Sequence, residues 1–258
     1  MHGRTALITG SAKGLGKRTA LQLAGLGCDV VLNYKDSKEE AQRTVSEIER
    51  LGVRATAIQA DITTIDGVSR LAEEASAWNG DIDILINNAG PFVRERRLFA
   101  DSDEAEVIRL VNGNLTGVML LDHKLLPGMR KRRWGRIVHF GFGHAGEARA
   151  WPHRAAYAAA KTGLVSFTKT LAVEEAPFGI TVNMIGPGDI KGSFKEASIV
   201  ETAGKIDEES PIGRPGTGED VARVISFLCH PNSDFLTGNI INVTGGFDPI
   251  RPNIHTNG

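Results

Sequence analysis

The stretch Thr5-Ala-Leu-Ile-Thr-Gly-Ser-Ala-Lys-Gly-Leu-Gly16 joins a short apolar run to the closely spaced glycines Gly10, Gly14 and Gly16. The apolar run is typical of a buried parallel strand, and the pattern over residues 17–26 predicts a helix. A glycine turn between strand and helix lets backbone N–H groups approach a pyrophosphate, and the helix N-terminus adds positive potential there. Taken alone, such a turn is equally consistent with a simple bend.

Apolar runs and amphipathic patterns alternate along the rest of the chain. The runs predict strands at residues 29–33, 53–59, 82–86, 135–141, 180–185 and 239–243. Helical patterns lie at residues 37–51, 64–78, 103–117, 118–132, 155–176 and 218–228. We therefore predict an α/β fold, a single-domain doubly wound (Rossmann) parallel sheet of about seven strands with helices on both faces. Residues 1–258 form one domain in this interpretation, and the irregular residues 189–215 form a mobile substrate lid.

The composition argues against several classes of function. The 258 residues are 41% hydrophobic and 24% charged with a net charge of −1, so nucleic acid and membrane surfaces are not expected partners. Cys28 and Cys229 fit neither a disulfide framework nor a metal-ligand spacing, and no metal site is expected. The N-terminal sequence has the pattern of neither a signal peptide nor a spanning helix. We expect a cytoplasmic protein in a reducing compartment.

Tyr157 and Lys161 fall four residues apart in the helical stretch 155–176 and therefore share one helix face. A tyrosine ordinarily titrates at about pH 10, and a neighbouring ammonium lowers that pKa. Proton transfer is most efficient when the pKa approaches the working pH, so the pair is a candidate for acid–base catalysis. The same spacing also fits a half-buried tyrosine beside a solvated lysine.

Several motifs stand in order along the chain: Thr9-Gly-Ser-Ala-Lys-Gly-Leu-Gly16, Asn87-Asn-Ala-Gly90, Asn114-Leu-Thr-Gly117, Tyr157-x-x-x-Lys161 and Pro187-Gly188. Together they resemble the short-chain dehydrogenase/reductase family over nearly the whole chain. The segment from Pro211-Ile-Gly-Arg-Pro215 through Leu236-Thr-Gly238 to Gly245-Gly246 is most similar to the β-ketoacyl–acyl-carrier-protein reductase branch. That branch also contains reductases of unrelated small carbonyls. The resemblance implies an oxidoreductase that reduces a ketone, either a β-ketoacyl thioester or another small carbonyl, to a secondary alcohol by hydride transfer.

The resemblance also implies roles for catalytic residues. Tyr157 would donate a proton to the carbonyl oxygen. Lys161 would lower the pKa of Tyr157 and hold the nicotinamide ribose. Asn114 would position a water that links Lys161 to a proton relay.

A cofactor site is implied at the carboxyl ends of the strands. Asn87, Ala89 and Gly90 would line the adenosine and ribose, and Asp61 with Ile62 would meet the adenine. The asparagines are alternatively turn residues, and the aspartate is alternatively a helix cap. The predicted cofactor-binding set is Gly10, Lys13, Gly14, Leu15, Gly16, Tyr34, Lys35, Asp61, Ile62, Asn88, Ala89, Gly90, Tyr157, Lys161, Pro187, Gly188 and Ile190.

The charged residues after the second expected strand predict whether NAD(H) or NADP(H) is preferred. NAD-preferring proteins place an Asp or Glu there to accept from the ribose 2′-hydroxyl. This chain has Tyr34 and Lys35 at that place and Lys13 in the glycine loop, and cations favour a 2′-phosphate. Asp36 argues in the opposite direction. We predict NADP(H) as the preferred cofactor, with NAD(H) as the alternative.

The resemblance breaks after the fifth expected strand, where the family has a serine that donates to the substrate oxygen. Phe142 falls at that position, and no Ser or Thr occurs between Arg136 and Tyr157. Losing one such donor typically costs about 10²–10³ in rate. Three explanations stay open: the enzyme is slow, His144 or His153 supplies the donor, or the protein is a catalytically impaired nucleotide-binding or redox-sensing member.

The run Arg130-Lys131-Arg132-Arg133 bears on partners. It is either a solvated loop or part of a docking surface for acyl-carrier protein, since Arg133 matches a docking arginine of the similar reductases while Phe178 replaces a second. Members of the family generally form homotetramers through residues 103–132, residues 155–176 and the last strand, and we expect the same here. The sequence does not specify which small-molecule or acyl-thioester substrate is used.

Overall fold

The computed structural model describes residues 1–248 and residue 250 of the chain. The seven expected strands are β1 (Thr5–Ile8), β2 (Asp29–Tyr34), β3 (Ala55–Gln59), β4 (Ile84–Asn87), β5 (Gly135–Phe140), β6 (Ile180–Pro187) and β7 (Ile240–Val243). They pair in parallel throughout and form one sheet in the order β3-β2-β1-β4-β5-β6-β7. The predicted doubly wound sheet is confirmed.

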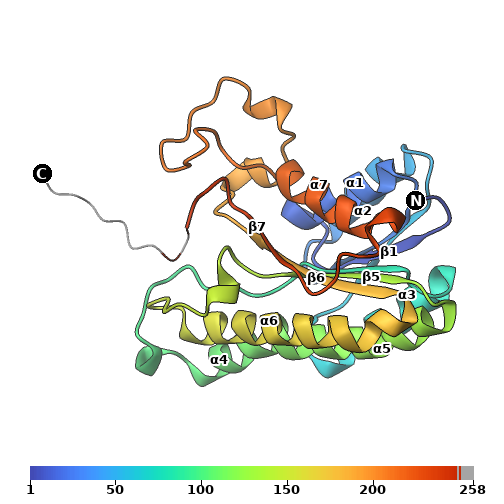
Figure 1. Ribbon diagram of the computed structural model, residues 1–258, viewed down its shortest axis with the longest axis horizontal. Helices are drawn as coiled ribbons and strands as arrows, with labels where there is room; N and C mark the ends of the chain where they lie inside the picture. Colours follow the sequence, from blue (N-terminus) through green and yellow to red (C-terminus); the bar gives the residue numbers. More distant parts are fainter. Residues whose placement is uncertain (249, 251–258) are drawn as a thin grey trace, which may run out of the picture.

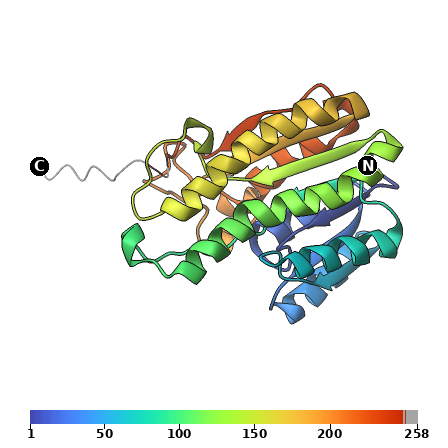
Figure 2. The same cartoon turned by 90° about the horizontal axis from the view of Figure 1, so that it is seen from below.

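Helices cover both faces of this sheet (Figure 1). One face carries α1 (Gly14–Gly25), α2 (Lys38–Glu49) and α7 (Gly218–Cys229), and the other carries α3 (Ile65–Asn79), α4 (Glu104–Val111), α5 (Gly117–Arg132) and α6 (Ala155–Glu175). Seen from below, α5 and α6 run along the second face (Figure 2). Alternate residues of β1 serve the two cores, since Ala6 and Ile8 pack with the first helix layer and Leu7 with the second. Both faces are buried, which explains the continuous apolar runs in the sequence.

The order of the strands reverses between β1 and β4. The chain moves from β1 outward to β2 and β3, then returns to the other side of β1 with β4. Connections on the two sides of this point diverge and leave a crevice at the carboxyl ends of the strands, where ligands bind in such folds. The glycine loop after β1 and the Asn-Asn-Ala-Gly turn after β4 both lie there.

Two helical stretches differ from their predicted bounds by more than two residues. Helix α1 begins at Gly14 rather than at residue 17, so two of the loop glycines belong to its first turn. Between α4 and α5, residues Asn112–Thr116 form a π-helix that the periodicity of the sequence did not indicate. Such single-turn bulges are frequent at functional sites. This one contains Asn114.

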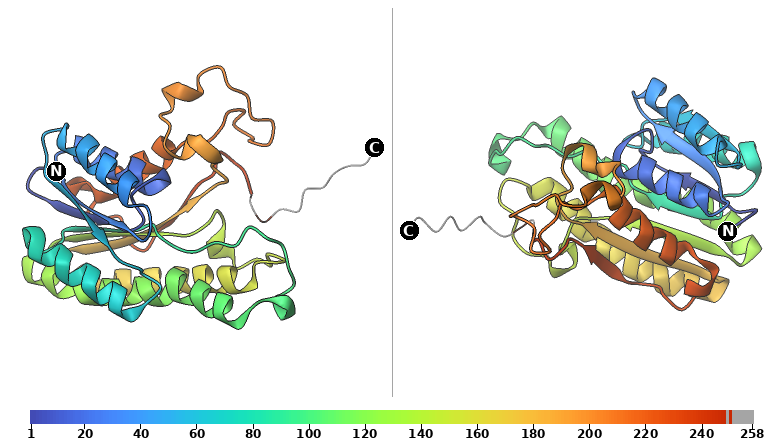
Figure 3. Two further views of the ribbon diagram at one scale, coloured as in Figure 1. Left: turned by 180° about the vertical axis from the view of Figure 1, so that it is seen from behind. Right: turned by 90° about the horizontal axis from the view of Figure 1, so that it is seen from above.

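Residues 189–215 are irregular, as predicted. They contain only two short 3₁₀ turns, Gly192–Lys195 and Val200–Thr202. In Figure 3 this orange segment projects beyond the sheet on the side of α1 and α7. Throughout the described part of the chain, we find no helix with the length and apolarity needed to cross a membrane.

Candidate active site

The glycine loop and the turn after β4 lie against each other. Asn88 Nδ2 donates to Thr9 O at 2.9 Å and to Gly10 O at 3.1 Å, and Ala89 N donates to Thr9 Oγ1 at 2.9 Å. A Cβ atom at Gly10 would lie 2.9 Å from Ala89 Cβ, and one at Gly16 would lie 2.5 Å from Gly10 O. These contacts require glycine, because any side chain would push the two loops apart.

The N-terminus of α1 holds a carboxylate of the same chain. Gly14 N donates to Glu196 Oε1 at 2.8 Å, and Lys17 Nζ lies 3.5 Å from Glu196 Oε2. The residue that precedes the helix, Lys13, provides no side-chain cap. The first N–H groups of a helix need such an acceptor, and phosphate is the ligand that this geometry favours. The Glu196 carboxylate occupies the position that an anionic ligand would take, so the loop fits the pyrophosphate of a dinucleotide.

The side chains of Asn114 and Lys161 both approach Gly90, at the end of the turn after β4. A Cβ atom at Gly90 would lie 2.2 Å from Asn114 Oδ1 and 3.5 Å from Lys161 Nζ. Asn114 Nδ2 donates to Pro91 O at 2.8 Å and to Leu110 O at 2.9 Å. Its Oδ1 is buried and has no hydrogen-bond partner among the described residues. A buried acceptor of this kind suits a bound water or a ligand hydroxyl.

Tyr157 and Lys161 do not show the predicted electrostatic coupling. Burial raises the pKa of the Tyr157 phenol above its usual value and lowers the pKa of the Lys161 ammonium to about 7. Lys161 Nζ donates to Phe140 O at 2.6 Å. The expected lowering of the tyrosine pKa is therefore wrong for the chain by itself. Burial in a low-dielectric environment favours the neutral form of both groups.

Comparisons with known proteins agree with this geometry. The sequence model of the family described as "Enoyl-(Acyl carrier protein) reductase" matches residues 10–248. The chain is 46% identical to a Bacillus subtilis (strain 168) protein named "Putative oxidoreductase YtkK", over 97% of this chain and 98% of that protein. It is 36% identical to the 3-oxoacyl-[acyl-carrier-protein] reductase FabG of Staphylococcus epidermidis, over 94% of this chain and 98% of that protein. The chain belongs to the short-chain dehydrogenase/reductase family.

Solved structures of the family superpose closely on this fold. A Bacillus thuringiensis protein described as a "putative 3-oxoacyl-reductase" is 45% identical, with a TM-score of 0.89 over 96% of this chain and 99% of that one. A blue fluorescent protein from a metagenomic library, solved in complex with NADPH, is 29% identical, with a TM-score of 0.83 over 95% of this chain and 98% of that one. The chain therefore shares its fold and its motifs with oxidoreductases of this family.

The position of the family's serine is filled by an aromatic ring. Phe142 is buried, and its ring centroid lies 4.8 Å from that of Trp151 and 6.0 Å from that of Tyr157. Phe92 approaches Tyr157 edge-on at 5.0 Å. A cavity of about 300 Å³, largely apolar in its lining, extends from Tyr157 and Trp151 to Leu110. The candidate proton donor is thus surrounded by aromatic side chains.

The loop that follows Phe142 adopts an unusual backbone conformation. His144, Ala148 and His153 have φ angles of 67°, 51° and 66°, a region that residues other than glycine rarely adopt. Such conformations are often retained at functional sites. His144 Nδ1 lies 2.6 Å from Glu147 Oε1, so this ring nitrogen is engaged within the loop. Its role as the serine substitute stays a prediction.

Of the residues predicted to select the cofactor, Tyr34 is buried and Lys35 is exposed. Tyr34 is buried beneath the glycine loop and packs with Ala12, so its ring supports the loop from below. Lys35 is exposed, and its Nζ lies 2.8 Å from Asp61 Oδ2. Asp61 Oδ1 accepts from the backbone N–H and the hydroxyl of Thr63. The ammonium at the end of β2 is therefore shared with the aspartate at the end of β3.

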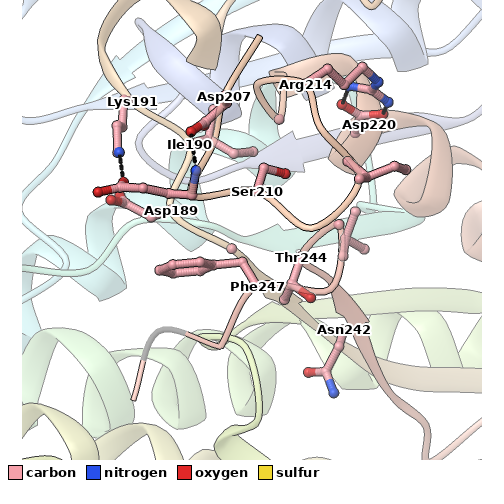
Figure 4. Close-up of a pocket in the computed structure, with 16 residues that line it drawn as sticks. Asp189, Ile190, Lys191, Asp207, Ser210, Arg214, Asp220, Asn242, Thr244 and Phe247 are labelled. Carbon is pink, nitrogen blue, oxygen red and sulfur yellow. Dashed lines mark hydrogen bonds and ion pairs between the residues drawn. The ribbon is translucent and has the colours of Figure 1, made fainter. Parts of the chain in front are cut away.

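The segment after β6 forms one wall of a second cavity. A Cβ atom at Gly188 would lie 3.0 Å from Thr244 Cα, and Ile190 is buried. These residues line a cavity of about 210 Å³ between residues 189–216 and the end of β7 (Figure 4). Charged residues of this lining pair with one another, as in Lys191–Glu209 and Arg214–Asp220.

Asn87 does not line the cofactor site, contrary to the prediction. Its side chain turns into the core and Nδ2 donates to Asp122 Oδ1 at 2.7 Å. Asp122 and His139, which no sequence motif indicated, are fully buried. A charged residue inside the apolar run of a helix, directly after Leu120 and Leu121, is the signal that could have identified Asp122.

The basic run 130–133 contacts its own chain. Arg130 Nε donates to Glu175 at 2.7 Å, and Arg133 donates to Pro177 O at 2.8 Å. The first three residues of the run belong to the last turn of α5 rather than to a solvated loop, and Arg133 follows the helix as its C-cap. It leads into the start of β5, at the end of the sheet away from Tyr157. These contacts occupy two arginines of the proposed carrier-protein surface.

Proposed function

We propose that the protein is an NADP(H)-dependent oxidoreductase that reduces a ketone to a secondary alcohol. The observation that carries the proposal is the placement of Asn114 Oδ1, buried without a described partner, beside Lys161 Nζ and behind the glycine-bounded turn 87–90. A ligand hydroxyl or a water between these two groups would satisfy both. Tyr157 lies one helical turn before Lys161 on the same helix.

Each residue would have a distinct task. Bound NADPH would supply the hydride to the carbonyl carbon. Tyr157 would give its proton to the carbonyl oxygen, and its raised pKa keeps the phenol protonated at neutral pH. Lys161, exchanging its bond to Phe140 O for a ribose hydroxyl, would hold the cofactor. Lys161 and a water on Asn114 would then return a proton from solvent to the tyrosine.

The substrate would be neutral and apolar near the carbonyl. The cavity beside Tyr157 is lined by Val93, Leu98, Val107 and Trp151, among others. Of its charged lining residues, Arg97 pairs with Glu95 and Glu106, and Arg154 donates only to backbone oxygens. A β-ketoacyl thioester or another small ketone fits these surroundings. Relatives described as 3-oxoacyl-[acyl-carrier-protein] reductases support the thioester.

NADP(H) is the proposed cofactor because Lys35 directly follows β2 and Lys13 is exposed in the glycine loop. A related structure was solved with NADPH. Asp61 shares the Lys35 ammonium and weakens this preference, so NAD(H) is the alternative. Comparing the two cofactors at equal concentration separates them.

The test is a turnover assay with NADPH and a panel of ketones that includes an acetoacetyl thioester, followed by loss of cofactor absorbance. We expect oxidation of NADPH that Tyr157→Phe abolishes. Failure of every ketone to consume NADPH, with Tyr157→Phe indistinguishable from the parent, would count decisively against the proposal.

A second candidate function is nucleotide binding or redox sensing without turnover. It is favoured by one observation, the substitution of the serine donor by Phe142. This function predicts stoichiometric NADPH binding with no consumption across the same ketones. Cofactor oxidation that disappears in Lys161→Ala would exclude it.

A further inference from the structure

A chain of buried polar side chains joins β4, α5, β5 and α6. Asn87 Nδ2 donates to Asp122 Oδ1 at 2.7 Å, and Asp122 Oδ2 lies 2.8 Å from His139 Nε2. His139 Nδ1 lies 2.8 Å from Thr168 Oγ1, which donates to Leu164 O at 2.7 Å. Asp122, His139 and Thr168 are each fully buried. Burying these groups is costly unless every one of them is paired, and here each has a partner.

The distances fix where the protons are. Thr168 must direct its hydroxyl hydrogen at Leu164 O, because two oxygen acceptors would not approach to 2.7 Å without one. Thr168 therefore accepts from His139, and Nδ1 carries a hydrogen. The remaining ring nitrogen shares one proton with Asp122, either as imidazolium with carboxylate or as imidazole with carboxylic acid. In both forms Asp122 can accept the hydrogen bond of Asn87.

This polar chain ends at the cofactor-binding turn. Asn87 and His139 are cross-strand partners at the carboxyl ends of β4 and β5. The residue after Asn87, Asn88, is bonded to the glycine loop, so the turn is fixed on one side by that loop and on the other by Asp122. Thr168 lies on the helix that carries Tyr157. The chain thus connects the turn to the catalytic helix.

We propose that Asp122 and His139 form a positioning pair that holds the turn 87–90 in place for the cofactor. The inference rests on the proposed cofactor use. Neither residue touches the reacting atoms. Removing Asp122 would leave the buried amide of Asn87 without its acceptor, and the turn would lose its anchor on the side of α5.

Isosteric variants separate the two contacts of the histidine. Asp122→Asn keeps all of the hydrogen bonds, because its amide can donate to the neutral Nε2 while its oxygen accepts from Asn87. His139→Gln places an amide near Nε2 and keeps the bond to Asp122. His139→Asn places an amide near Nδ1 and keeps only the bond to Thr168. Asp122→Ala removes the anchor altogether.

Two readouts are measured for each variant. The first is the dissociation constant of NADPH from a fluorescence titration, and the second is hydrogen exchange at the amides of Asn88 and Ala89 without cofactor. We expect Asp122→Ala to weaken NADPH binding about tenfold or more, His139→Asn to weaken it less, and Asp122→Asn and His139→Gln to stay within about twofold. Exchange in the turn should rise in the same order.

Ile225→Ala is the matched control, because Ile225 is equally buried but lies on the other face of the sheet. It should lower stability without changing either readout. If Asp122→Ala behaves like this control, or His139→Gln weakens binding as much as His139→Asn, the proposal is overturned. Should Asp122→Ala fail to fold, the two histidine variants decide. If the parent does not bind NADPH, the proposed function fails, while exchange in the turn still tests the pair.

Discussion

Phe142 presents only carbon atoms at the place where the family carries a hydroxyl donor. Its ring packs against Trp151 and Tyr157, so the site has exchanged a hydrogen bond for apolar contact. In the proposed reaction, a developing negative charge on the substrate oxygen would depend on Tyr157 and on any donor from the loop 141–154. The chemistry of one side chain therefore sets the expected rate.

We expect Phe142→Ser to raise kcat on an accepted ketone by about tenfold or more, because a restored donor is worth up to about 10²–10³. The same change should lower the melting temperature, since removing a buried phenyl ring typically costs about 3–5 kcal/mol. Steady-state kinetics and thermal unfolding measure the two effects. An unchanged kcat in a variant that still binds NADPH would mean that another donor is present. His144→Ala, which should then lower kcat, is the decisive comparison.

Lys161 makes stability depend on pH. Its pKa is about 7 in the folded chain and 10.5 ordinarily, so the unfolded state binds more protons between these values. The free energy of unfolding should therefore rise with pH from about 7 to 10.5, at up to about 1.4 kcal/mol per pH unit. Lys161→Met lacks this pH-dependent contribution to the free energy of unfolding. The variant should therefore be more stable than the parent at pH 7, by a margin that shrinks towards pH 10. Denaturant titrations at several pH values would refute the argument if the margin stayed constant.

At the scale of elements, residues 189–215 touch the glycine loop through Glu196. Its carboxylate accepts from the Gly14 amide at the start of α1, where the pyrophosphate of a dinucleotide would bind. A bound cofactor would therefore compete with this segment for one N–H group. Binding of cofactor should displace this contact and change how the segment sits on the loop.

Glu196→Gln should tighten NADPH binding severalfold, because it removes a negative charge from the phosphate site. The gain should be larger at low ionic strength, where charges are less screened. A titration at two salt concentrations measures both effects. Glu208→Gln, an exposed residue of the same segment, is the charge-matched control. Weaker binding in Glu196→Gln alone would place this carboxylate outside the phosphate site.

For the whole molecule, exposed apolar side chains lie on the helices through which we predict a homotetramer. Ile108 on α4, Met119 on α5 and Val173 on α6 are 59%, 40% and 76% exposed. The family resemblance predicts a homotetramer through these helices and the last strand.

We expect the protein to migrate as a tetramer, and Val173→Glu to shift it to a smaller species. Light scattering coupled to size-exclusion chromatography measures the mass. Lys169→Glu changes an exposed charge on the same helix and should leave the mass unchanged. A parent that is monomeric at micromolar concentration would contradict the prediction, as would an unchanged mass for Val173→Glu.

Much of this molecule could be predicted from local patterns. The apolar runs predicted the seven strands, because residues buried on both faces of a parallel sheet are continuously apolar. The spacing of Gly10, Gly14 and Gly16 predicted a loop that closely approaches its neighbours. The alternation of strands and helices predicted a parallel, doubly wound sheet, whereas the order of its strands came from the structure.

Contacts between distant residues could not be predicted in this way. The turn of Asn87 towards Asp122, the π-helix around Asn114 and the raised pKa of Tyr157 depend on groups that are far apart in the chain. The predicted effect of Lys161 on Tyr157 failed for the same reason. Helical spacing gives the proximity of two groups, but the burial of both is set by elements packed around them.

The sequence by itself determined the fold, the order of the motifs and the absence of the usual serine, since each is written in spacing and residue type. The tertiary structure decided which groups meet. It brought Glu196 to the glycine loop, closed aromatic rings around Tyr157 and placed Asp122 and His139 beneath the cofactor turn. Hydrogen bonds and desolvation act over a few ångströms in space, irrespective of separation along the chain, and only the packed molecule sets those distances.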